Sequence, residues 1–136
     1  ALASHLVALC QGRVVVQGRL SDVARDARFQ ALLDPRDVGA AIPANLLYSD
    51  HTPSEQALWL RADHVLLAAE APRAISARNV LAGEIATIAR EKNGSYLIEL
   101  ATSAGTVLSR LTGAAVRELE LTQGKRAWAL IKAHSV

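Results

Sequence analysis

The sequence predicts a mainly β protein: a small closed β-barrel with one short helix, preceded by a hairpin and a helix. Half of the 136 residues (51%) are hydrophobic and only 4% are aromatic, which is typical of a packed aliphatic core. From residue 74 onward, short apolar runs with alternating polarity are separated by turn residues. Since no apolar run reaches the roughly 18 residues of a membrane-spanning helix, we expect a soluble protein.

The first 39 residues predict local hairpin and helix structure. Residues 1–19 indicate a short helix end followed by a hairpin, HLVALC and RVVVQG, with its turn at QG. Ser21 is the expected N-cap of a helix over residues 21–33, whose apolar residues fall on one face. The breaker cluster DPRDVGA, residues 34–40, is the best candidate for a linker.

Residues 40–73 carry the weakest pattern, with two prolines and little alternation before residue 57. LWLRADHVLLAAE predicts one or two strands around a polar break at residues 61–64, and AAEAPR a connector.

Residues 74–136 predict three strands, a short helix and a last strand. GEIATIAR and SYLIELA are joined by a hairpin turn at KNG, and TVLSRL follows the turn TSAG. Thr112 is the expected cap of a helix in GAAVRELEL, and RAWALIK is the last strand. The order β-β-β-α-β is typical of a small barrel of the OB type, in which closure removes exposed strand edges.

Several function classes lack their motifs. The sequence contains no GxxxxGK[ST], GxSxG or HExxH motif, so this chain alone is not expected to hydrolyse ATP. The four histidines show no metal-ligand spacing, and no carboxylate pair stands in a catalytic context. The single Cys10 lies in the apolar run LVALC and is expected to be a buried, inert thiol.

A nucleic-acid role is disfavoured as well. The chain has 15 Lys and Arg against 13 Asp and Glu, without a dense basic face. Barrels that stack nucleic-acid bases require aromatic residues interleaved with basic ones, and the few aromatic residues of this chain are not arranged in this way.

What remains is an anion-binding hypothesis centred on SARN. A tetrahedral oxyanion is held by converging N–H donors, hydroxyls and one or two cations. Ser76 offers a hydroxyl, Ala77 permits close approach, and Arg78 supplies charge or structural support, all just before a strand begins. Asn79 can hold the turn, and Lys132, with the Ala133–Ser135 backbone and hydroxyl, would complete the site. The alternative interpretation is that SARN is only a turn with a solvated arginine before a strand, and that Lys132 is an ordinary lysine at a strand end.

ISARNVLAGEI and GKRAWALIKAHSV together resemble the molybdate- or tungstate-binding module of the Mop or TOBE type. That module begins with S-A-R-N-x-L-x-G and ends with G-K-x-x-x-A-x-I-K-A-x-S-V, and the resemblance covers residues 74–136. It implies an OB-like Mop/TOBE barrel with molybdate or tungstate as ligand and no covalently bound cofactor. The implied oxyanion-binding residues are Ser76, Ala77, Arg78, Asn79, Thr112, Lys132, Ala133 and Ser135.

Residues 1–23 are similar to the end of an ABC-transporter ATPase domain. The two resemblances together imply the C-terminal portion of the ATP-binding subunit of a molybdate importer, a subunit that is an ABC-type ATPase. They divide the chain into an ATPase tail (1–39), a shortened upstream TOBE segment and linker (40–73) and the oxyanion-binding module (74–136).

For the parent protein, the resemblance implies a cytoplasmic location at the inner membrane, reached through the permease subunit. It also implies a homo-oligomer, a dimer, with the ligand site at its interface and a regulatory role for the bound oxyanion. The alternative is a structural module that dimerises the ATPase subunits without binding a ligand.

Overall fold

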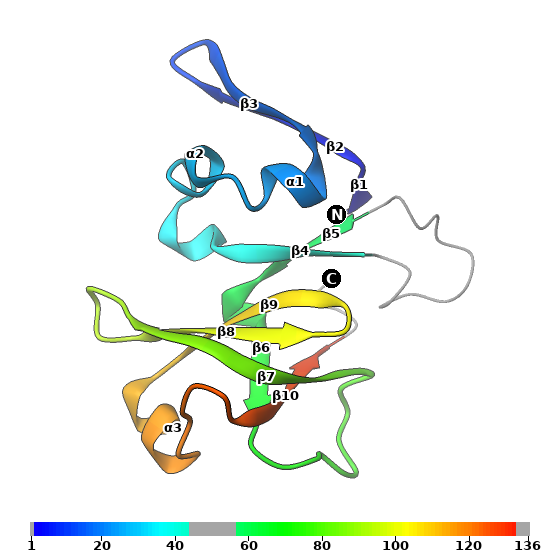
Figure 1. The fold of residues 1–136 in the computed structure, drawn as a ribbon, viewed down its shortest axis with the longest axis vertical. Coiled ribbons are helices and arrows are strands. Elements are labelled where there is room, and N and C mark those ends of the chain that lie inside the picture. Colours follow the sequence, from blue (N-terminus) through cyan, green and yellow to red (C-terminus); the bar gives the residue numbers. More distant parts are fainter. Residues whose placement is uncertain (1, 44–56, 133–136) are drawn as a thin grey trace.

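The computed structural model describes residues 2–43 and 57–132, and it is mainly β (Figure 1). Its elements form three sheets and three short α-helices in the described ranges. The strands are β1 (Leu2–Ala3), β2 (His5–Cys10), β3 (Arg13–Arg19), β4 (Gly39–Pro43), β5 (Ala57–Arg61), β6 (Val65–Ala68), β7 (Asn79–Arg90), β8 (Tyr96–Thr102), β9 (Gly105–Leu111) and β10 (Arg126–Ile131). The helices are α1 (Leu20–Val23), α2 (Ala27–Gln30) and α3 (Gly113–Glu118), with the 3₁₀ helices η1 (Pro35–Asp37) and η3 (Ala62–His64).

The β2–β3 hairpin forms where the sequence predicts it. Gln11 and Gly12 at its turn have φ of 50° and 74°, the left-handed pair that a tight two-residue hairpin requires. The prediction of a helix end before the hairpin was wrong: this segment is strand β1, which pairs with β5 through Leu2 and Leu58. In Figure 1 the hairpin lies at one end of the molecule, away from the large sheet.

The helix predicted over residues 21–33 is broken into α1 and α2. Helix α1 begins at Leu20 without a side-chain cap, so Ser21 is not the N-cap. Asp26 interrupts the predicted helix, because its carboxylate accepts a hydrogen bond from the Arg28 backbone N–H at 2.9 Å and so caps a new helix, α2. The Arg28 guanidinium also donates to Asp26, at 3.0 and 2.8 Å. A side chain that captures local donors in this way competes with continuous helix.

The segment at residues 34–40 contains η1 and the first residues of β4. Asp34 caps η1 through the Arg36 backbone N–H, and the buried Gly39 starts β4. A Cβ at Gly39 would lie 2.3 Å from the Leu60 carbonyl oxygen, so only glycine permits this approach of β4 to β5.

The five-stranded sheet has the order β6-β10-β7-β8-β9, all antiparallel. The strands predicted in residues 74–136 are confirmed, as are β5 and β6 around the polar break. Thr112 caps α3 by accepting from the Ala115 N–H at 3.2 Å, as predicted. The sheet curls, but in the described ranges β6 and β9 are its edges and no ladder joins them, so the closed barrel is not confirmed.

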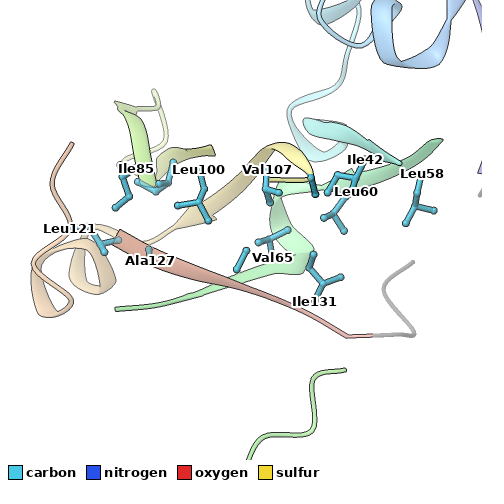
Figure 2. Close-up of a cluster of buried hydrophobic side chains, with 13 residues drawn as sticks. Ile42, Leu58, Leu60, Val65, Ile85, Leu100, Val107, Leu121, Ala127 and Ile131 are labelled. Atoms are coloured by element: carbon cyan, nitrogen blue, oxygen red, sulfur yellow. The ribbon is translucent and has the colours of Figure 1, made fainter. Parts of the chain in front are cut away.

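One hydrophobic core lies inside the curl and extends to β4 and β5 (Figure 2). Ile42 and Leu60 from the three-stranded sheet are fully buried against residues of the five-stranded sheet. The core therefore joins residues on both sides of the connector at 69–78. Its largest members include Ile42, Leu58, Leu60, Val65, Ile85, Ile98, Leu100, Val107 and Ile131.

Cys10 is exposed, so the prediction of a buried thiol was wrong. Only one face of the β2–β3 hairpin packs on α1 and α2, where Val16 is buried. The other face leaves Val7, Leu9 and Val14 more than half exposed.

Candidate functional site

The SARN segment lies in an irregular connector between β6 and β7. Ser76 and Arg78 are exposed, and Ala77 is half-buried. Strand β7 begins at Asn79, which pairs with Ile131 of β10. Residues 76–78 therefore immediately precede the ladder, as the sequence predicts.

Lys132 directly follows Ile131, the partner of Asn79 on β10. Because Asn79 pairs with Ile131 at the end of an antiparallel ladder, Arg78 and Lys132 both lie one residue beyond this last pair, at the same end of the sheet. On its other side Ile131 pairs with Val65, which has His64 just before it. The end of the sheet thus presents His64, Lys132 and Arg78 across three adjacent chain segments.

A groove of about 560 Å³ lies at this end of the sheet. It brings together three of the predicted residues, Ser76, Ala77 and Lys132. The other described residues that line it are Asp63, His64, Leu66, Ile75 and Leu130. A hydroxyl, a small residue and an ammonium group around one open groove can accommodate a small anion.

The other predicted residues are not gathered here. Arg78 and Asn79 adjoin the groove in sequence without lining it, and Ala133 and Ser135 lie outside the described residues. Thr112 lies at the far end of the sheet: it follows Leu111, which pairs with Tyr96, and Tyr96 pairs with Arg90 at the end of β7. Figure 1 shows α3 and the beginning of β7 on opposite sides of the sheet.

Among the described residues that line the groove, one is a carboxylate, Asp63, and its charge is compensated. Arg110 of β9 donates from Nη1 to Asp63 at 2.8 Å and from Nε and Nη2 to Glu91 at 2.7 and 2.9 Å. The hydrogen bonds to Glu91 foremost, and then to Asp63, raise the pKa of the Arg110 guanidinium, against the opposing effect of partial burial. Lys132 consequently faces a groove in which the negative charge already has a partner.

Sequence reasoning missed Asp63 and His64 as groove residues. Their position depends on the pairing of β6 with β10, which lie more than 50 residues apart in the chain. The available signal was the polar break RADH directly before a strand.

A second cavity, of about 450 Å³, lies between α1 and the outer face of β8 and β9. Its charged lining residues are Arg25 and Glu99, and none of the predicted site residues reaches it. Because opposite charges line it without a converging set of donors, we do not regard it as the candidate anion site.

Within the described ranges, no three His, Cys, Asp or Glu side chains are grouped as metal ligands would be, and none of the helices is long and apolar enough to cross a membrane.

Comparison with protein families matches residues 75–136 to the TOBE domain. Among curated proteins, a probable molybdenum-pterin-binding protein of Haemophilus influenzae is 46% identical over 65 residues, covering 46% of this chain and 90% of that protein. The molybdenum import ATP-binding protein ModC of Rhizobium etli is 27% identical over 153 residues, covering 96% of this chain and 42% of that protein. The chain spans about two fifths of the length of such ModC relatives.

Among solved structures, the cytoplasmic molybdate-binding protein ModG with molybdate bound is similar in fold. It aligns with a TM-score of 0.50 and 36% sequence identity over 55% of this chain and 54% of ModG.

Proposed function

The chain belongs to the TOBE-domain family through residues 75–136, and on this basis we propose that it binds molybdate or tungstate as the regulatory C-terminal module of a molybdate-import ABC ATPase subunit. The parent polypeptide would carry the ATPase activity, and this module would sense the transported oxyanion. Relatives named for molybdenum import and molybdate binding support the choice of ligand.

The observation that carries the proposal is the meeting of Ser76, Ala77 and Lys132 in one groove. These residues come from two segments more than 50 positions apart, which the β7–β10 ladder brings together. An ammonium group beside a hydroxyl favours a small dianion, while Ala77 leaves room for close approach. Arg78, which directly precedes the first ladder residue of β7, would add a second cation.

The proposed site is shared between two copies of the chain. In one copy Thr112 lies at the far end of the sheet from Ser76, so only a second copy could bring its hydroxyl near. An apolar row, in which Leu66 and Val80 flank Leu130 on neighbouring strands, crosses the outer face of the sheet, and Leu66 and Leu130 also line the groove. Leu66 is 58% and Val80 39% exposed, which suits a homodimer face.

In the importer, residues 1–39 would be the tail of the ATPase domain. The rest of that domain would cover the exposed face of the β2–β3 hairpin. Residues 40–73 would be the shortened upstream TOBE segment and residues 74–136 the oxyanion module. The permease would be the membrane partner, and the module would lie on the cytoplasmic side. For the oxyanion to regulate import, it must bind two transporter conformations with different affinity.

The second candidate function is a dimerising module that binds no ligand. The apolar row formed by the exposed Leu66 and Val80 with the half-buried Leu130 between them favours it, since such a row needs no anion to drive association. In that case the SARN segment is a turn that begins β7.

Isothermal titration of this chain with molybdate and with tungstate, and with sulfate as a matched dianion, distinguishes the two functions. We expect saturable binding of molybdate, weaker or no binding of sulfate, and loss of binding in Lys132→Ala. Lys92→Ala is the matched control, because Lys92 is an exposed lysine in the β7–β8 turn, at the other end of β7. Absence of molybdate and tungstate binding in a folded dimer would leave the structural function.

A further inference from the structure

We propose that His64 is a further oxyanion-binding residue and that it makes ligand binding strengthen as the pH falls; this inference rests on the proposed oxyanion function. The segment before β6 was not expected to contribute to the site. It places an imidazole in the same groove as Ser76 and Lys132.

The sheet register fixes where His64 stands. The β6–β10 ladder ends at the pair of Val65 and Ile131, so the residue before Val65 and the residue after Ile131 lie at the same end of the sheet. His64 and Lys132 are those two residues, and both line the groove. His64 ends the 3₁₀ helix η3 and is not part of the ladder, so the shared groove lining, and not a strand pair, places the two side chains around one ligand site.

His64 also has the exposure that a ligand contact needs. It ends η3 and is exposed, whereas its neighbours Ala62 and Val65 are buried and anchor the segment. The imidazole is therefore held on a fixed backbone, and its side chain remains accessible to a ligand in the groove.

The charges around His64 set the direction of the pH dependence. Asp63, on the same 3₁₀ helix, is paired with Arg110 of β9, which is also paired with Glu91 just after β7. From β10 the groove receives Lys132, and Arg78 adjoins it from the connector. Protonation of an imidazole here adds a positive charge beside Lys132, which attracts a dianion more strongly. Imidazoles as a class change charge between about pH 5 and pH 8.

The test is the dissociation constant for molybdate at about pH 6 and about pH 8, on either side of most of that range. The chain as it stands is compared with His64→Gln, His64→Lys and the matched control His5→Gln. His5 is an exposed histidine in the β2–β3 hairpin, in a different sheet from the groove.

For the unchanged chain and for His5→Gln we expect binding about fivefold tighter at the lower pH, the size of one added charge near a solvated ligand. His64→Gln should bind about equally at both pH values, with the weaker affinity. His64→Lys should bind about equally at both, with the stronger affinity. Titration of molybdate itself would affect every variant alike, so the differences report the side chain.

A His64→Gln variant that keeps the full pH dependence of the unchanged chain would overturn the inference while leaving the proposed function intact. Absence of molybdate binding by the unchanged chain at both pH values would instead overturn the proposed function, and the inference with it. Thermal unfolding of each variant confirms that all four proteins are folded.

Discussion

The Ser109 hydroxyl donates a hydrogen bond to the Val65 carbonyl oxygen at 2.7 Å, across the two edges of the curled sheet. The N–H of Val65 bonds to the Ala62 carbonyl oxygen, so neither backbone group of Val65 is available to a β9 ladder. A buried side chain, 1% exposed, thus satisfies the β6 edge where a closed barrel would use strand pairing.

Ser109→Ala should destabilise the chain by about 1–3 kcal/mol, because the buried Val65 carbonyl loses its partner. Denaturant unfolding measures the change in the free energy of unfolding. Ser103→Ala, in the exposed β8–β9 turn, is the control and should change it by less than about 0.5 kcal/mol. Equal stabilities of the two variants would show that the Ser109 bond contributes nothing.

Arg110→Met should destabilise by about 2 kcal/mol, because it removes three charge-assisted hydrogen bonds and leaves Asp63 and Glu91 without their shared cation. Arg110→Lys should recover only part of the loss, since an ammonium group cannot reproduce the guanidinium fork. Arg36→Met is the comparison, because the side chain of Arg36 is 83% exposed in its pair with Asp34. Thermal and denaturant unfolding of the three variants gives the ranking, which a full rescue by lysine would contradict.

The hairpins of the fold were predictable from the sequence, whereas its non-local pairings and one local helix break were not. Alternation and turn residues gave the strands after residue 74, because each hairpin joins neighbours in the chain. Partners in the β4–β5 pairing, such as Ala40 and Leu60, lie about 20 residues apart in the chain, and no periodic pattern in the sequence indicated that they pair. The predicted helix over residues 21–33 failed because the Asp26–Arg28 interaction competes locally with helix.

The same distinction applies to the candidate site. The motifs identified Ser76, Ala77 and Lys132, which the groove unites. His64 was missed because its approach to Lys132 depends on the β6–β10 register, which one sequence does not reveal. Thr112 was correctly predicted as a helix cap, but its distance from Ser76 along the sheet could be judged only from the fold.

Gly83→Ala should destabilise by about 2 kcal/mol or more, because a Cβ there would lie 2.4 Å from the Ala101 carbonyl oxygen on β8. The strand would have to move away from its partner, which disturbs the ladder beside the fully buried Leu100. Ala89→Val, at an exposed position of the same strand, adds apolar volume without this contact and is the control. A Gly83→Ala protein with unchanged melting temperature would show that the β7–β8 approach is not restrictive.

Asp26 should give the chain a pH-dependent contribution to stability. The side-chain hydrogen bond from Arg28 foremost, and the Arg28 backbone N–H, lower the pKa of the Asp26 carboxyl from 3.8 to about 2. A carboxyl whose pKa is lower in the folded state stabilises above its unfolded value, and this contribution is lost as the pH falls through the folded value. Asp26→Ala should therefore be less stable than the unchanged chain near neutral pH, and the difference should shrink between about pH 4 and pH 2. Unfolding curves over that range measure it, and a difference independent of pH would contradict the Asp26–Arg28 pair as its cause.

Leu66→Glu should prevent self-association if the outer face of β6, β10 and β7 is the dimer face. Leu66 is 58% exposed beside Leu130, so a glutamate there leaves the core intact but places a charge in the apolar row. Leu9→Glu is the matched control, because Leu9 is 63% exposed on the β2–β3 hairpin, in another sheet. Sedimentation equilibrium should give a dimer for the unchanged chain and for Leu9→Glu, and a monomer for Leu66→Glu. Because Leu66 also lines the groove, the shared site is tested with Val80→Glu, in the same apolar row but outside the groove lining. If the site is shared between copies, a Val80→Glu monomer should bind molybdate more weakly; a monomer with undiminished affinity would place the whole site within one chain.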